Sequence, residues 1–212
     1  MAVFLLIRHA ENDFLQHRRL AGRKAGVHLN TQGHRQAAEL SRSLADLPIE
    51  AIYSSPLERA RETAEPLSVR SGLPIHLLPA LNEIEFGDWT GAQFEQLAED
   101  ARWQAFNSFR SGTRIPGGET IVEVQARMVA ALQELCMLHP EGPVALFGHG
   151  DPIKTVLAHF LGMPLDFVTR LRVAPASISA VRFASWGAEV LCVNAAHVNS
   201  SLFEFSGGLR RG

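Results

Sequence analysis

The chain has 212 residues, 46% of them hydrophobic and 20% charged, and this ordinary globular balance excludes a disordered chain. The formal net charge is −2, so composition predicts neither a nucleic-acid partner nor a membrane partner. Two cysteines, Cys136 and Cys192, are too few for a disulfide framework and lack metal-ligand spacing. The apolar run at residues 2–7 is too short for a signal peptide or a membrane span. We therefore expect a soluble cytoplasmic protein.

The N-terminal part predicts a strand, a loop and a helix. Residues 2–7 are apolar without alternation, which is typical of a strand buried on both faces. The polar stretch at residues 10–30 is too irregular to predict an element. From Thr31 apolar residues recur at helical spacing, with Asn30 or Thr31 as N-cap. The residues expected on the buried face of this helix are Ala37, Leu40, Leu44 and Leu47.

The next segment predicts two more strands, at residues 51–53 and 75–78, separated by a helix. Pro56 is expected in the first turn of that helix, because its missing N–H is tolerated there. The buried stripe of the helix would consist of Ala60, Ala64 and Leu67.

A longer helix is expected from about Glu119 to the breaker cluster at residues 140–143. Residues 144–147 predict another buried strand, and residues 178–184 and 189–193 predict an antiparallel hairpin. The residues expected on the buried face of the longer helix are Ile121, Val124, Met128, Leu132, Leu135 and Leu138.

The turn at residues 148–152 is expected to open a further helix. Asp151 suits an N-cap ahead of Pro152 at the first helical position. The alternative is that Asp151 is an extra acid or a substrate contact. The inward-facing residues of this helix would be Ile153, Val156, Leu157 and Phe160.

Strands alternating with helices predict an α/β fold, a three-layer α/β/α sandwich with a mostly parallel sheet and an antiparallel edge. No repeat or long linker divides the chain, so residues 1–212 are expected to form a single domain. Residues 92–116 would be a short helical insertion, and residues 206–212 a frayed tail.

Two histidines follow predicted strands, where open α/β sheets bind ligands. A lone histidine there is more often a hydrogen-bonded loop residue, but His9 and His149 together indicate a site. Gly150 leaves room beside the second histidine, where a helix begins and offers free N–H groups. Arg8 precedes His9, and Arg59 lies near a helix start, where a cation is unfavourable unless an anion binds. These residues together predict a pocket for a phosphoryl group.

Five segments, in chain order, resemble the signature blocks of the histidine phosphatase superfamily, the phosphoglycerate mutase-like proteins. Residues 6–11 are similar to its Arg-His-Gly signature, and residues 53–64 to its Ser-Ser-Pro block. Residues 81–91 are similar to its glutamate loop, residues 116–119 to its Gly-Gly-Glu segment and residues 147–150 to its second-histidine motif. The resemblance implies the phosphoglycerate mutase-like fold for the chain.

The resemblance also implies roles for individual residues. His9 would be the nucleophile, and Glu83 the general acid and then the base, its pKa raised by burial or by charge from Glu85 and Asp88. Arg8, Arg59 and His149 would surround the phosphate. The further substrate-binding candidates are Asn12, Arg23 and Gly150, although Arg23 could equally belong to a solvated basic loop.

The chain departs from the family pattern at Ala10, Asn12 and Leu15, which replace a glycine, a Ser or Thr, and an Asn common in mutase-like members. These changes leave the phosphate pocket intact but put mutase-like substrate contacts in doubt. Other chemistries lack support, since the sequence has no Walker A, dinucleotide-binding or nucleophile-elbow motif. No metal-ligand spacing is present, and no cofactor is expected. Trp89 and Trp103 are expected in the core.

The sequence therefore predicts a metal-independent phosphomonoesterase that acts on a small phosphorylated metabolite through a phosphohistidine. One alternative is a phosphoglycerate mutase-type phosphotransferase, and another is a catalytically silent phospho-ligand binding protein. Residues 92–116 lack the long basic insertion typical of dedicated mutases, which favours hydrolysis. The substrate stays open, with specificity expected in residues 12–28 and 92–116. The sequence leaves the oligomeric state open, a homodimer included.

Overall fold

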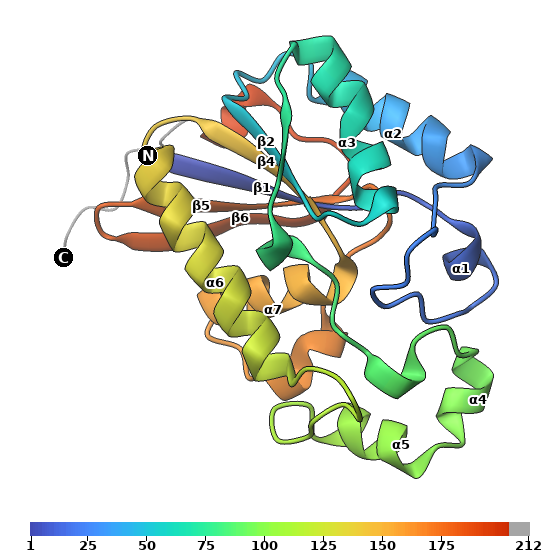
Figure 1. Cartoon of the computed structure of the whole chain (residues 1–212). Coiled ribbons are helices and arrows are strands. Elements are labelled where there is room, and N and C mark those ends of the chain that lie inside the picture. The colour runs from blue at the N-terminus through green and yellow to red at the C-terminus, as the bar shows by residue number, and fades with distance from the viewer. Residues whose placement is uncertain (204–212) are drawn as a thin grey trace.

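The computed structural model describes residues 1–203, and the predicted frayed tail at 206–212 lies outside them. Its strands are β1 (Ala2–Arg8), β2 (Ala51–Ser54), β3 (Ile75–Leu77), β4 (Pro143–Gly148), β5 (Ile178–Ala184) and β6 (Gly187–Ala195). They form one sheet in the order β3-β2-β4-β1-β5-β6 (Figure 1). The pairs β1–β4, β4–β2 and β2–β3 are parallel, whereas β5 is antiparallel to both β1 and β6. The predicted parallel sheet with an antiparallel edge is confirmed.

Helices cover both faces of this sheet. They are α1 (Asp13–Gln16), α2 (Thr31–Ser43), α3 (Glu58–Ser71), α4 (Phe94–Ala98), α5 (Ala101–Ser108), α6 (Ile121–Leu138) and α7 (Gly150–Phe160). Short 3-10 helices lie at Pro79–Leu81, Gly87–Trp89, Leu165–Arg170 and Ser200–Phe203. α2 and α3 pack together on one face, and α6 and α7 pack together on the other. The three layers are visible in Figure 1, where α4 and α5 lie below the sheet.

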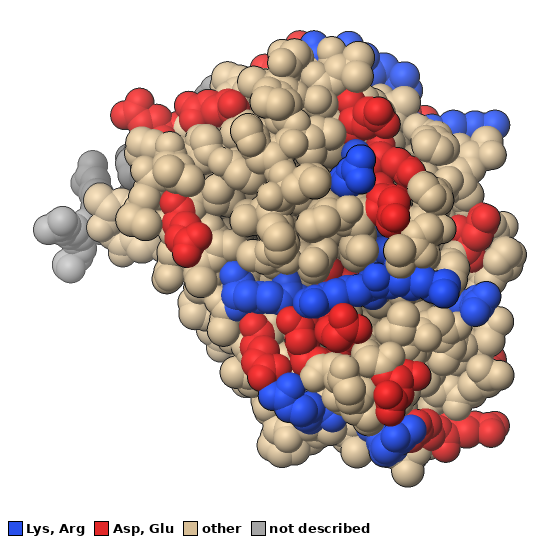
Figure 2. Space-filling model, viewed as in Figure 1, with Lys and Arg blue, Asp and Glu red and all other residues tan. Residues whose placement is uncertain are grey.

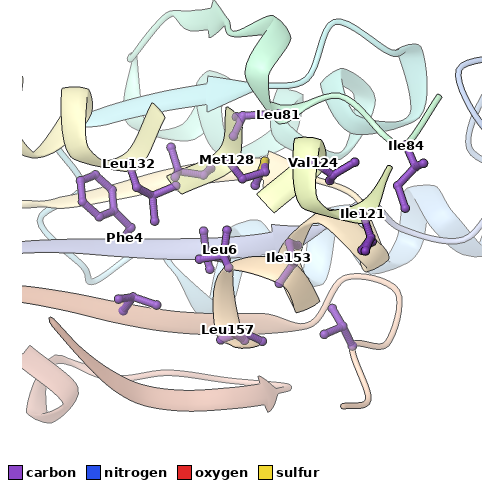
Figure 3. Packing of buried hydrophobic residues seen from close by; sticks show 14 of the residues in the cluster. Phe4, Leu6, Leu81, Ile84, Ile121, Val124, Met128, Leu132, Ile153 and Leu157 are labelled. Carbon is purple, nitrogen blue, oxygen red and sulfur yellow. The ribbon is translucent and has the colours of Figure 1, made fainter. Parts of the chain in front are cut away.

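The alternation of β1 between two cores explains why its sequence is continuously apolar. Val3, Leu5 and Ile7 face the cluster that contains the α2 and α3 side chains. Phe4 and Leu6 face the opposite cluster, where α6 and α7 contribute (Figure 3). Each strand residue is therefore buried whichever way it points. The predicted helix positions that are buried are Ala37, Leu40, Leu44, Leu47, Ala60, Ala64, Leu67, Ile121, Val124, Met128, Leu132, Leu135, Ile153, Val156 and Leu157.

Four local predictions are wrong, the first three of them at α1, α3 and α6. The segment expected to be irregular contains the one-turn helix α1, because the Asn12 side chain accepts from the Leu15 N–H and caps it. Pro56 precedes α3 instead of lying in its first turn, since Leu57 is the extended N-cap residue. Leu138 is 68% exposed, because α6 ends there and the chain turns towards β4.

Asp151 is not the N-cap of α7. The helix begins at Gly150, and the extended residue before it is His149. Asp151 therefore lies inside the first turn, where its carboxylate pairs with basic side chains instead of with backbone N–H groups. Within residues 1–203, no helix combines the length and apolar character needed to cross a membrane.

We expect Leu132→Ala to lower the free energy of unfolding by about 2–5 kcal/mol, because it opens a cavity between α6 and the sheet. Leu132 is fully buried in the α6 and α7 core. The matched control is Leu138→Ala, the same substitution on the same helix at an exposed side chain. Urea denaturation measures both, and equal losses would contradict the packing described here.

Candidate active site

The pairing of β1 with β4 places two histidines side by side. Arg8 and Gly148 are in register at the carboxyl ends of these parallel strands, and the His9 N–H donates to the Gly148 carbonyl at 2.9 Å. His9 and His149 follow directly, and their ring centroids lie 5.2 Å apart. Both imidazoles are buried. The two histidines expected to share a site therefore do so.

Two arginines border the histidines. Arg59, the second residue of α3, is 1% exposed, and its Nη2 donates to the Gly22 carbonyl at 2.7 Å. Arg8 donates through Nη1 to the Val173 carbonyl at 2.7 Å. One turn beyond Arg59, the Thr63 hydroxyl accepts the N–H of Ala10 at 3.0 Å, which ties α3 to the chain beside His9.

Several N–H donors at this position are buried without an acceptor. They are Nε of Arg8, Nε and Nη1 of Arg59, and Nδ2 of Asn12, none of which meets an acceptor within the described residues. A buried unsatisfied polar group costs about 1–3 kcal/mol, and more when it is charged. An anion with several acceptor oxygens would satisfy them, so this geometry favours a phosphoryl group over a neutral ligand.

A cavity of about 130 Å³ opens at these donors. Of the eight predicted site residues, six line it: Arg8, His9, Asn12, Arg59, Glu83 and Gly150. His149 lies behind the wall, against His9 and Arg59. A Cβ at Gly150 would lie 3.3 Å from the Arg8 Nε, so the glycine lets this side chain lie across the start of α7.

His9 has a fixed tautomer and a free ring nitrogen. Its Nδ1 lies 2.8 Å from the Ala10 carbonyl, which can only accept, so Nδ1 carries the proton. Nε2 is left with its lone pair. Burial lowers the pKa of His9 well below its usual value, and the positive charges of Arg59 and Arg8 lower it further. The imidazole is therefore neutral and nucleophilic at neutral pH.

His149 takes part in a directed chain of hydrogen bonds. Arg59 donates through Nη2 to its Nδ1 at 3.3 Å, so Nε2 carries the proton and donates to the Ser55 hydroxyl at 2.9 Å. Ser55 in turn donates to the Asn82 side-chain oxygen at 2.9 Å. Burial lowers the pKa of His149 well below its usual value, and Arg59 and His9 add to this effect. The ring is neutral and held from both sides.

Glu83 behaves as an acid poised near neutrality. Burial raises the pKa of its carboxyl to about 6, and the negative charge of Asp151 adds to this. Arg59 opposes the shift but does not cancel it. Of the two expected causes, burial is confirmed, but the negative charge comes from Asp151, brought in by α7, and not from Glu85 or Asp88.

Asp151 stays ionised between two cations. Its carboxylate accepts from Lys154 at 2.9 Å and from Arg110 at 3.2 Å. Burial acts to raise the pKa of Asp151, but Lys154 and Arg110 outweigh it and bring the pKa to about 2. The alternative that Asp151 is an extra acid therefore has no support at neutral pH.

The mouth of the cavity has an apolar side. Arg19, which also lines it, donates Nε and Nη2 to the Gly91 carbonyl at 3.1 and 2.9 Å, and its guanidinium stacks on Phe14. That arginine is therefore largely engaged with the protein itself. The apolar lining consists of Leu15, Leu20, Ala21, Phe86 and Phe94.

Arg23 does not lie where it could contact a substrate in the cavity. Its Nε donates to the backbone carbonyl of Glu83 at 2.8 Å, and its Nη2 pairs with Glu119 at 2.9 Å. It is not among the residues that line the cavity. The structure thus places Arg23 behind the glutamate loop, and the alternative of a solvated loop cation does not hold either.

The sequence did not assign three residues to this site: Lys154, Arg110 and Ser55. The spacing of Asp151 and Lys154, three residues apart on a helix, is a signal that would have predicted their ion pair. Arg110 comes from the loop after α5, and nothing in its local sequence indicates its partner. Ser55 was present in the Ser-Ser-Pro block, but its contact with His149 depends on the packing of β2 against β4. Within residues 1–203 no cluster of three or more His, Cys, Asp or Glu side chains is placed to hold a metal ion.

Comparisons with known proteins agree with this geometry. The family model described as the histidine phosphatase superfamily (branch 1) matches residues 4–196. The probable phosphoglycerate mutase GpmB of Escherichia fergusonii is 34% identical over 182 residues, which cover 84% of this chain and 83% of that protein.

Two solved structures are similar in fold and length. A phosphoserine phosphatase mutant from Entamoeba histolytica, in complex with phosphoserine, has a TM-score of 0.85 and 26% identity, covering 92% of this chain and 98% of that one. A mycobacterial glucosyl-3-phosphoglycerate phosphatase, in a complex with VO3, has a TM-score of 0.82 and 30% identity, covering 91% and 98%.

We expect Asp151→Asn to move the pKa of Glu83 below 6. The substitution removes the negative charge that raises this pKa, and it leaves Arg110 and Lys154 uncompensated, which favours the ionised carboxylate of Glu83. Carbon-13 NMR titration of glutamate-labelled protein measures the shift, with the Glu83 signal identified by its loss in Glu83→Gln. The control is Asp88→Asn at an exposed carboxylate, and an unchanged Glu83 titration in Asp151→Asn would contradict this assignment.

Proposed function

Because the chain belongs to the histidine phosphatase superfamily (branch 1), we propose that it is a phosphomonoesterase that works through a phosphohistidine on His9. The observation that carries the proposal is the buried, neutral His9 imidazole, with its proton on Nδ1 and a free Nε2 beside donors that lack an acceptor. Nucleophile and anion site therefore coincide. The substrate would be a small phosphorylated metabolite.

In the first step, the Nε2 lone pair of His9 forms a bond to phosphorus as the bond from phosphorus to the ester oxygen breaks. The protonated Glu83 gives its proton to the leaving oxygen, which departs as an alcohol. A pKa of about 6 suits this role, because a fraction of the carboxyl is still protonated near neutral pH.

In the second step, water attacks the phosphorus of the phosphohistidine. Glu83, now a carboxylate, accepts a proton from this water, and the bond from phosphorus to Nε2 breaks. Inorganic phosphate leaves, and both His9 and Glu83 return to their starting protonation states. One carboxyl group thus serves as acid and then as base.

Arg8 and Arg59 would stabilise the charge on the transferred group. Phosphoryl transfer proceeds through a loose transition state, so fixed positive charge and positioning provide most of the catalysis. We expect this charge to replace that of a metal ion, so activity should survive EDTA.

His149 lies behind the cavity wall in this structure, and it would reach the phosphoryl group through Nδ1, because its Nε2 is bonded to Ser55. To donate to a phosphoryl oxygen its proton must lie on Nδ1, and Arg59 must then turn its hydrogen bond from this nitrogen to the ligand. The Ser55 hydroxyl would in that state donate to Nε2. Phosphoryl binding would therefore reverse the direction of the hydrogen-bond chain through His149.

A phosphoglycerate mutase-type transferase is the second candidate, favoured by the names of the curated relatives. Such an enzyme returns the phosphoryl group to the substrate and must hold a doubly phosphorylated intermediate. The apolar lining and the engaged Arg19 give a second phosphate few partners. The similarity to two phosphatase structures supports hydrolysis. Phosphoglycerate mutase activity, assayed beside phosphate release, separates the two reactions.

We expect a radiolabelled phosphoryl group to be trapped on the protein by rapid mixing and alkaline quench, and to be absent from His9→Ala. Turnover should be lost in the same variant, because the nucleophile is gone. EDTA should change neither label nor turnover in the wild type. The control is His17→Ala, an exposed histidine. Label or turnover retained by His9→Ala would contradict the proposal.

We expect Glu83→Gln to slow phosphorylation of His9 by an alkyl phosphate about 10²–10⁴-fold, but to change phosphorylation by p-nitrophenyl phosphate little. An alkoxide needs a proton to leave, whereas p-nitrophenolate does not. Single-turnover rates are required, since loss of the base slows later hydrolysis for both substrates. The control is Glu65→Gln on the exposed face of α3. Equal losses for both substrates would remove Glu83 from the acid role.

A further inference from the structure

The segment that carries Glu83 is bound tightly to the segment at 116–119. The Asp88 N–H donates to the Pro116 carbonyl, and the Glu119 N–H donates to the Glu85 carbonyl, both at 3.0 Å. The backbones approach so closely that a Cβ at Gly118 would lie 2.1 Å from the Glu85 carbonyl oxygen. This explains Gly118, the second of the two glycines before Glu119, which the proposed chemistry does not use.

The Glu119 carboxylate joins the glutamate loop to two arginines. It accepts the Glu85 N–H at 2.9 Å and Nη2 of Arg23 at 2.9 Å. Arg127, on α6, reaches both of its oxygens, through Nε at 3.0 Å and Nη2 at 3.2 Å. The side chains of Glu119 and Arg127 are each only 19% exposed, so solvent screens this contact incompletely.

Both arginines also bind the backbone of Glu83 itself. The Glu83 carbonyl accepts from Nε of Arg23 at 2.8 Å and from Nη2 of Arg127 at 3.2 Å. Arg127 further donates through Nη1 to the Ala80 carbonyl at 2.6 Å. Figure 2 shows basic side chains in a band across the face that carries α6, with acidic side chains beside it.

Apolar contacts fix the same loop from the other side. Leu81 and Ile84 flank Glu83 and are buried in the core with Val124 and Met128 of α6 (Figure 3). The main chain at Glu83 is therefore held between a packed core and a pair of guanidinium groups. Such a fixed backbone fixes the point from which the carboxyl group extends.

We propose that Glu119 is a positioning residue for the general acid, and that it acts by holding Arg23 and Arg127 against the Glu83 carbonyl. This inference rests on the function proposed above. Glu119 touches neither the cavity nor His9, so its contribution passes through Glu83. Misplacement of a catalytic group by about 1 Å can cost about 10²-fold in rate. The loss should therefore fall on substrates that need the acid.

The test compares single-turnover phosphorylation of His9 by an alkyl phosphate and by p-nitrophenyl phosphate in Glu119→Gln and Arg127→Met. We expect the alkyl rate to fall about 10²-fold and the p-nitrophenyl rate to stay close to that of the wild type. Arg127→Lys should not restore the alkyl rate, because an ammonium cannot make the two-pronged contact. The control is Arg102→Met, which removes an exposed arginine with a similar two-pronged contact to Asp100.

A double-mutant cycle with Glu83→Gln separates this inference from the proposed function. If Glu119 acts through Glu83, Glu119→Gln should cause no further loss of the alkyl rate in the Glu83→Gln background. Equal losses for both substrates, or independent losses in the cycle, would overturn the positioning role. Failure of Glu83→Gln alone to discriminate the substrates would overturn the acid assignment instead.

Loss of folding is checked by thermal unfolding of each variant. If Glu119→Gln is partly unfolded at the assay temperature, Arg23→Met takes its place. It removes one of the two donors to the Glu83 carbonyl and leaves the Glu119–Arg127 pair. The alkyl rate should again fall selectively, and an unchanged ratio of the two rates would contradict the proposal.

Discussion

The placing of one buried guanidinium group, that of Arg59, beside the partly buried group of Arg8 at one edge of the sheet is the constraint on which the site depends. Arg8 and Arg59 keep their positive charge in a place where water does not reach every N–H. Acceptors or negative charge in their surroundings must therefore compensate it. Their charge adds to burial in keeping His9 and His149 neutral. It also leaves N–H donors without an acceptor, which an anion with several oxygens would satisfy. The neutral imidazole of His9 and the N–H donors without an acceptor therefore have the same origin.

Two carboxylates balance positive charge around this centre without entering the proposed chemistry. Asp151 lies between Arg110 and Lys154, and Glu119 lies between Arg23 and Arg127. The first acts through its field, since it raises the pKa of Glu83. We propose that the second acts through geometry. By this proposal, the protonation of Glu83 depends on burial and on Asp151, whereas its position depends on Glu119.

The sequence was sufficient for features that depend on local pattern. The continuous apolar run of β1, the helical stripe of α6 and the two histidines after β1 and β4 were predicted because burial and strand ends leave a direct imprint on composition. Contacts with residues from distant segments leave no such pattern in the local sequence. Asp151 was expected to cap α7, but tertiary pairing with Arg110 competes with that local role. Arg23 was expected at substrate or in solvent, because the carbonyl it binds is 60 residues away.

The residues that distinguish hydrolysis from transfer are those around the opening of the cavity, and not those that would hold the transferred phosphoryl group. Both reactions need the same nucleophile, arginines and acid, so those residues cannot distinguish them. A transferase must also bind the second charged end of its intermediate. Apart from Arg8 and Arg59, the cations that line the cavity are engaged, Arg19 with the Gly91 carbonyl and Lys154 with Asp151, while Leu15 and Phe94 add apolar surface. A phosphohistidine formed in this setting would lack a bound second phosphate to compete with water, which is why we propose hydrolysis for this chain.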